Sequence, residues 1–102
     1  MELKAGSRWR SAVCDTEVVV VKPPGGEVVL ECGGEPMLPV GSERPDGATP
    51  AAGFDTGTPI GKRFAHEATG LELLATKGGA GTLAVDGVAV PLKDAKPLPA
   101  SD

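Results

Sequence analysis

Three side chains in this sequence are of the types that thiol or metal chemistry uses: Cys14, Cys32 and the single histidine, His66. The cysteines are 18 residues apart and neither belongs to a Cys-x-x-Cys pair, so a four-ligand zinc site within one chain is poorly supported. Three interpretations of the pair stay open: buried reduced thiols acting as small apolar side chains, a disulfide or redox couple, or a reactive thiol at Cys32.

The sequence around Cys32 argues both for and against reactivity. The next residues, Gly33-Gly34, have amides that could approach a thiolate as an anion-binding nest does. On the other side, no helix N-terminus is expected after Cys32, and neighbouring carboxylates would raise the thiol pKa; these are Glu17, Glu31 and Glu35. We therefore expect no catalytic residue, with Cys32, Cys14 and His66 as the candidates if the protein is a thiol enzyme. The alternative for His66 is a surface histidine or a satisfied core histidine.

Candidate binding residues lie near the first expected strand and in a long loop. Trp9 and Arg10 could form a ligand platform, and the alternative for Trp9 is a lid packed over one end of the core. Met37 and Phe54 are the candidates from the loop, where they are also expected to dock the chain on the sheet. Basic side chains could gather into a patch for a carboxylate or phosphate, or be scattered surface charge; they are Arg8, Arg10, Arg44, Lys62 and Arg63.

The glycine-rich stretches do not match a phosphate-binding loop. Gly78-Gly79-Ala80-Gly81 precedes an expected strand rather than a helix, and Gly61-Lys62-Arg63 lacks the hydroxyl of a P-loop. One histidine also falls short of a metal site built from several histidines and a glutamate. The sequence therefore predicts neither a cofactor nor a metal.

Composition limits the class of protein. A chain of 102 residues is one domain by length. A net charge of −4 with only one Trp, two Phe and no Tyr argues against nucleic acid, which needs a basic face and stacking aromatics. The start of the chain has no hydrophobic run after its charges, and the longest aliphatic run, Val18–Val21, is too short to span a bilayer. We expect a cytoplasmic protein, with no membrane contact and reduced cysteines.

The most prominent strand pattern is the stretch from Glu17 to Cys32. Valine-rich residues 17–22 and 27–32 flank Pro23-Pro24-Gly25-Gly26, which cannot continue a helix or a strand ladder. This pattern predicts a β-hairpin that pairs Val21 with Val28 and Val19 with Leu30. Whether Cys14 and Cys32 share a face depends on a bulge at Asp15-Thr16, because one extra residue reverses the side chains that precede it.

Other strands are expected near Arg8, at 62–67 and at 71–76. Asp86-Gly87 lies between alternating apolar arms, which is typical of a two-residue type I′ turn that pairs Val85 with Val88.

Together these elements predict a single domain over residues 1–102. Its ordered core covers about 8–32 and 60–92, a long loop covers 33–59, and an extended tail covers 93–102. The predicted fold is all-β: a small antiparallel β-barrel or sandwich of six to seven short strands with one long Pro/Gly-rich loop.

Since no catalytic constellation is evident, the predicted function is a small non-catalytic binding or accessory module that contacts a protein partner or forms a homo-oligomer. The first alternative is a small thiol-dependent enzyme or redox protein that uses Cys14 and Cys32 with His66. The second alternative is a metal or small-ligand carrier.

Overall fold

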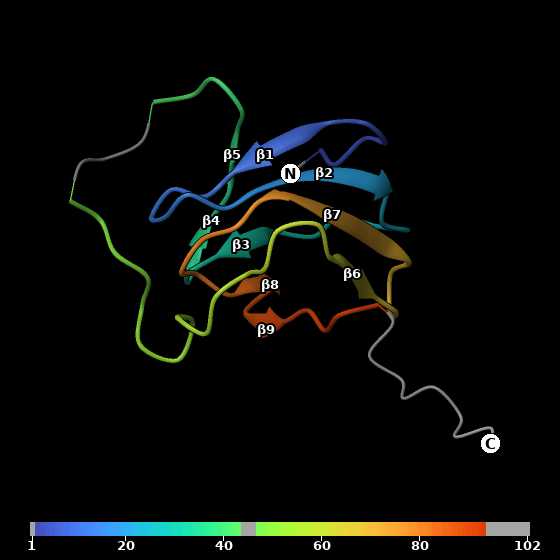
Figure 1. The fold of residues 1–102 in the computed structure, drawn as a ribbon. Helices are drawn as coiled ribbons and strands as arrows, with labels where there is room; N and C mark the ends of the chain where they lie inside the picture. The colour runs from blue at the N-terminus through green and yellow to red at the C-terminus, as the bar shows by residue number, and fades with distance from the viewer. Residues whose placement is uncertain (1, 44–46, 94–102) are drawn as a thin grey trace, which may run out of the picture.

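The computed structural model describes residues 2–43 and 47–93, and within them the protein consists of β-strands without any helix (Figure 1). Two antiparallel sheets, of five and four strands, form the molecule. The expected all-β fold is confirmed, and the architecture is sandwich-like rather than a closed barrel. The described residues form nine short strands instead of the six to seven expected. The described part of the chain accordingly holds no helix long and apolar enough to cross a membrane.

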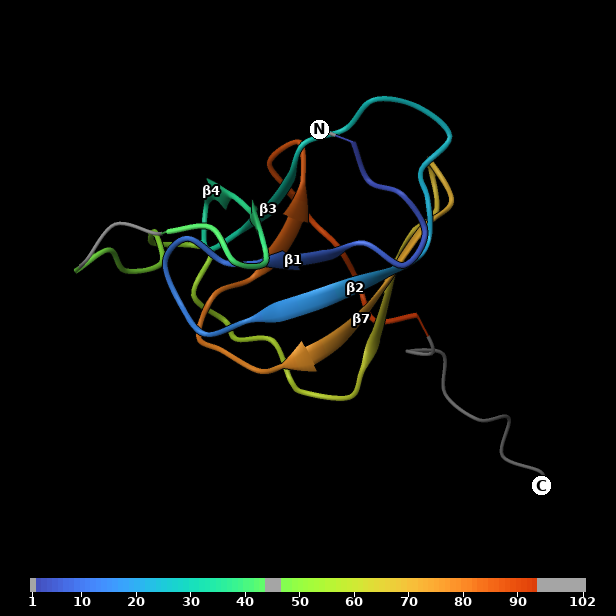
Figure 2. The same ribbon diagram turned by 90° about the horizontal axis from the view of Figure 1, so that it is seen from above.

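The five-stranded sheet has the order β5-β1-β2-β7-β6 and the four-stranded sheet the order β4-β3-β8-β9. Figure 2 shows β1, β2 and β7 side by side in one layer. The first sheet contains β1 (Arg8–Arg10), β2 (Glu17–Lys22), β5 (Leu38–Pro39), β6 (Arg63–His66) and β7 (Leu71–Lys77). The second contains β3 (Leu30–Cys32), β4 (Glu35–Pro36), β8 (Leu83–Val85) and β9 (Val88–Ala89).

The predicted hairpin between residues 17–22 and 27–32 is wrong, because β2 and β3 belong to different sheets. β2 pairs with β1 on one side and β7 on the other, so its valine run forms a central strand. Residues 23–29 cross to the second sheet instead of turning back. Seven residues easily span the ~10 Å between packed sheets. The prolines among them lack the backbone N–H that a strand donates to its neighbour.

The first hairpin is formed by β1 and β2 instead. Arg10 pairs with Glu17, and the amide of Ser11 donates to the carbonyl of Thr16 at 2.8 Å, which closes a loop over residues 11–16. The sequence had suggested at most a bulge at Asp15-Thr16 in this region. Cys14 therefore lies in a connecting loop, and strand alternation does not decide where its side chain points.

Two other predictions are confirmed. The strands expected at 62–67 and 71–76 are β6 and β7. In the β8–β9 hairpin, Val85 pairs with Val88, and the turn residues Asp86 and Gly87 have φ angles of 51° and 84°, as a type I′ turn requires.

The segment expected as a loop over 33–59 is irregular for most of its described length, but it contributes β4 and β5, one to each sheet. Met37 lies between these two strands and is only 2% exposed, so it docks the segment on the core as expected. Leu38 and Phe54 are partly buried. Of the predicted tail 93–102, all but Lys93 lies outside the described residues.

The core lies between the two sheets and is aliphatic. Its fully buried side chains come from both layers and include Val18, Val20, Leu30, Leu71, Leu73, Leu83 and Val85. Cys32 belongs to this cluster, and Trp9 and Cys14 pack against it. Each such aliphatic side chain contributes about 1.5–3 kcal/mol by leaving water.

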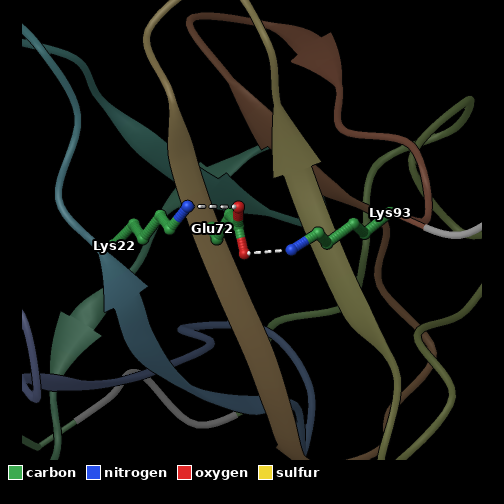
Figure 3. Close-up of polar contacts among 3 residues, drawn as sticks. All are labelled: Lys22, Glu72 and Lys93. Carbon is green, nitrogen blue, oxygen red and sulfur yellow. Dashed lines mark hydrogen bonds and ion pairs between the residues drawn. The ribbon is translucent and has the colours of Figure 1, made fainter.

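A buried carboxylate fastens the end of the described chain. Glu72 on β7 is 8% exposed and binds two lysines, Lys93 at 2.9 Å and Lys22 at 3.4 Å (Figure 3). The hydrogen bond from Lys93, assisted by the charge of Lys22, lowers the pKa of Glu72 although burial acts in the opposite direction. The amide of Lys93 also donates to the carbonyl of Arg63, so the chain after β9 runs along β6 and joins the second sheet to the first.

Candidate thiol site

The two cysteine sulfurs meet at one end of the sandwich. Cys14 lies in the β1–β2 loop and Cys32 ends β3, yet their Sγ atoms are 3.8 Å apart, with no disulfide between them. The β1–β2 loop and the segment after β7 lie at the same end of the molecule, opposite the β6–β7 turn (Figure 1). The site therefore combines one thiol from each sheet.

Ser11 fixes the loop that carries Cys14. Its hydroxyl oxygen accepts hydrogen bonds from the amides of Val13 and Cys14, both at 3.0 Å. Ser11 and Thr16 are fully buried, which is unusual for hydroxyl side chains and requires that they be hydrogen-bonded. The loop thus has a defined shape that sets the position of the Cys14 sulfur.

Polar groups surround the Cys14 sulfur. Its thiol lies 3.2 Å from the hydroxyl oxygen of Thr16, and the amide of Gly81 donates to the sulfur at 3.3 Å. Burial by itself raises the pKa of Cys14, but hydrogen bonds from Ser11, Thr16 and Gly81 outweigh it and lower the pKa to about 7. A substantial fraction of Cys14 is then thiolate near neutral pH.

Cys32 has the opposite character. It is fully buried, and burial, reinforced by repulsion from Cys14, raises the pKa of its thiol to about 12. The expectation that neighbouring glutamates would raise the Cys32 pKa had the right direction, but the cause is loss of solvent. Of the two thiols, the one that the sequence singled out as reactive is therefore the less reactive one.

The glycines after β7 allow the close approach of these groups. A Cβ atom at Gly79 would lie against the Thr16 hydroxyl, 2.6 Å from the Thr16 amide nitrogen and 3.0 Å from the Cys14 sulfur. A Cβ atom at Gly81 would lie 2.9 Å from the Cys32 sulfur. Thr58 holds the segment in place, because its backbone bridges Gly79 and its hydroxyl donates to the carbonyl of Gly81 at 2.7 Å.

Cys14 opens to a polar pocket of about 320 Å³, whereas Cys32 does not line it. The other lining side chains carry two positive and two negative charges; they are Arg10, Lys77, Asp15 and Glu17, with Thr16 beside them. A volume of this size suits a small molecule or a short peptide segment. The pocket gives a reagent access to one thiol of the pair only.

The other sequence candidates are distributed over the molecule. His66 pairs with Leu71 at the start of β7, roughly 20 Å along that strand from the thiol end, and its Nδ1 contacts the Thr69 hydroxyl at 2.8 Å. His66 is thus not part of the thiol site. Trp9 is half-buried, with its indole nitrogen donating to the Ser7 hydroxyl at 3.1 Å, and of the four binding candidates only Arg10 lines the pocket.

Sequence reasoning missed Ser11, Thr16, Gly79 and Gly81. The occurrence of Ser11, Cys14 and Thr16 within six residues was a local signal for a polar loop, and the glycines signalled close packing rather than phosphate binding. In residues 2–43 and 47–93 no three His, Cys, Asp or Glu side chains form a metal-binding group. The chemistry that this arrangement can perform is that of a dithiol.

Comparisons of the chain with protein-family models, curated proteins and solved structures found no significant match.

Proposed function

We propose that the protein carries out reversible thiol–disulfide exchange, with Cys14 as the attacking thiol and Cys32 as the resolving thiol. The observation that supports this most is the 3.8 Å separation of two sulfurs of which one lines a pocket and the other is enclosed. Cysteines that serve only as small apolar side chains do not require hydrogen-bond donors. Here the hydroxyls of Ser11 and Thr16 and the amide of Gly81 are directed at the Cys14 sulfur.

The proposed reaction has two steps. The Cys14 thiolate attacks one sulfur of an external disulfide, forms a mixed disulfide and displaces the other half as a thiolate. Cys32 then gives up its proton to the displaced thiolate and attacks the Cys14 sulfur, which releases the second half. Two electrons pass from the protein thiols to the external disulfide; the protein ends with a Cys14–Cys32 disulfide and the substrate as two thiols.

The geometry suits the second step. The sulfurs have to approach from 3.8 Å to a bond length of about 2 Å, a change of the size that side-chain rotation and a small loop shift supply. The high pKa of Cys32 keeps it protonated until a mixed disulfide forms beside it. His66 has no role in this scheme, which differs from the thiol mechanism expected from the sequence.

The test uses the wild type and the variants Cys14→Ser and Cys32→Ser with a neutral disulfide, bis(2-hydroxyethyl) disulfide, followed by intact mass. The wild type is expected to lose two hydrogens without keeping an adduct. Cys32→Ser should keep one mixed disulfide on Cys14, and Cys14→Ser should stay unmodified while folded. The rate of the Cys32→Ser reaction should rise with pH through a midpoint of about 7. A native wild type whose thiols react only on unfolding would overturn the proposal.

A second candidate function is the accessory module that acts through a protein contact or self-association. The supporting observation is β9, which ends the four-stranded sheet and leaves Val88 65% exposed. Val29 is 38% exposed and is linked to the adjacent turn, since its amide donates to Asp86 at 2.9 Å. A sheet edge with exposed valine is a surface on which a second strand can pair.

Light scattering combined with size-exclusion chromatography tests this second candidate. Val88→Lys should convert an oligomer to a monomer, whereas Ile60→Lys, at an equally exposed apolar residue in another segment, should not. A wild type that is monomeric at all concentrations excludes self-association through this edge.

A further inference from the structure

Arg10 is a pocket side chain whose guanidinium makes few hydrogen bonds to the described residues. One terminal nitrogen, Nη1, donates to the Ser42 carbonyl at the long distance of 3.4 Å. The Nε atom is buried without a hydrogen-bond partner, the one such side-chain atom among the described residues. A guanidinium has five N–H donors in a planar fork, and among the described residues the structure shows an acceptor only for Nη1.

The second cation of the pocket is already engaged. Lys77 forms an ion pair with Glu17 at 3.4 Å, across the pairing of β7 with β2. Within residues 2–43 and 47–93, no carboxylate pairs with Arg10 in the same way. Arg10 and Cys14 line one pocket, so a molecule bound beside the sulfur can also contact Arg10.

We propose that Arg10 selects the substrate of this thiol pair by binding a carboxylate group of a small disulfide, such as an amino-acid or short-peptide disulfide. The inference rests on the thiol–disulfide exchange proposed above and names its substrate class. A planar carboxylate matches the guanidinium fork and would supply acceptors for its unused donors.

The charged side chains that line the pocket are balanced, two positive and two negative. Glu17 pairs with Lys77, so the lining offers a phosphate or sulfate group no excess of positive charge. An amino-acid disulfide carries an ammonium group next to its carboxylate, which matches a lining without net charge.

The experiment measures the rate of mixed-disulfide formation on Cys14 in the Cys32→Ser background with three probes: dithiodiglycolate, which carries carboxylates, cystamine, which carries ammonium groups, and neutral bis(2-hydroxyethyl) disulfide. Each rate is divided by the rate of the same probe with 2-mercaptoethanol. Arg10→Gln removes the cation, Arg10→Lys keeps the charge without the fork, and Arg8→Gln is the matched control from the same strand but outside the pocket.

We expect Arg10→Gln to lower the normalised rate for dithiodiglycolate by about tenfold, the effect of losing one charge-assisted hydrogen bond. The rate with the neutral probe should stay the same, and the rate with cystamine should stay the same or rise. Arg10→Lys should fall between wild type and Arg10→Gln, and Arg8→Gln should match wild type.

The outcomes separate the two proposals. If Cys14 reacts with no probe in the native protein, the exchange function fails. If Cys14 reacts with all three probes equally, and Arg10→Gln changes all rates by the same factor or none, the exchange function stands and the substrate class is overturned.

Discussion

The two ends of β7 contain buried polar groups, and they satisfy them in different ways. At the start of the strand, the Glu72 carboxylate is neutralised by Lys22 and Lys93. Beyond the other end, hydrogen bonds from the Ser11 and Thr16 hydroxyls and from backbone amides lower the pKa of the half-buried Cys14 thiol to about 7.

This difference indicates what each end is suited for. A carboxylate with two ion-pair partners is already neutralised and serves structure rather than ligand binding. Through Lys22 and Lys93, Glu72 connects β2, β7 and the segment after β9. A thiol whose pKa hydrogen-bond donors lower is partly thiolate near neutral pH, and the thiolate is the nucleophilic form. One end of the sandwich thus carries a structural ion-pair cluster, and the other carries the thiols of the proposed exchange reaction.

The largest expected effect is that of oxidation. A Cys14–Cys32 disulfide would join the two sheets and close a chain segment of 18 residues, which should raise the free energy of unfolding by about 3 kcal/mol. Urea unfolding of the oxidised and reduced wild type measures the difference. Cys14→Ser treated with the same oxidant is the control and should show no gain. An oxidised protein that is no more stable than the reduced one would contradict the proposed geometry.

Gly79→Ala should disrupt the packing around the Cys14 sulfur. The added methyl group would collide with Thr16 and crowd the Cys14 sulfur, at a cost of about 2 kcal/mol in unfolding free energy. The rate at which Cys14 reacts with a neutral disulfide at pH 7 should fall as well, because the donors move away from the sulfur. Gly26→Ala is the matched control, since nothing lies within 4 Å of a Cβ atom there. Equal effects of both substitutions would show that the close approach at Gly79 is unimportant.

The outcome for the fold separates local signals from long-range ones. The Asp86-Gly87 turn was predictable because its type I′ geometry depends on two adjacent residues. The hairpin predicted for residues 17–32 failed because the valine run is compatible with any partner strand. One of its two actual partners, β7, is about fifty residues away, and the sequence pattern holds no information on that distance.

The candidate site was only partly predictable for the same reason. Cys14, Cys32 and Arg10 were identified by residue type, but their proximity depends on a loop between strands and on a crossing between sheets. The pKa order of the two thiols follows from burial and from the donors Ser11, Thr16 and Gly81, which converge only in three dimensions. His66 was included because it is chemically suitable, and topology places it at the opposite end.

Thr16→Val tests the role of neutral donors with a smaller effect. The substitution removes the hydroxyl that contacts the Cys14 sulfur and keeps the shape of the side chain. The pKa of Cys14 should therefore rise from about 7 toward its ordinary value. The cost in stability should be about 1 kcal/mol. The pH dependence of alkylation by iodoacetamide in the Cys32→Ser background gives the pKa. Thr69→Val removes the hydroxyl that contacts His66 at the other end of the molecule and should leave the pKa of Cys14 unchanged. No shift in Thr16→Val would mean that the hydroxyl does not stabilise the thiolate.

Glu72→Gln removes the charge of the carboxylate that pairs with Lys22 and Lys93. It should have the smallest effect on stability, visible mainly in the pH dependence of unfolding. The pKa of Glu72 is lowered in the folded protein, so the carboxylate adds stability above its unfolded pKa of about 4.3, and this contribution disappears as the pH falls through the lower folded value. Wild type should therefore be more stable than Glu72→Gln near neutral pH, and the difference should shrink in acid. Thermal unfolding from neutral to acidic pH measures it, with Glu2→Gln as the control from an exposed pair with Lys4. A wild-type advantage that persists unchanged in acid would show that the Glu72 contacts stabilise through shape rather than charge, and the two ends of β7 would then differ less than their chemistry suggests.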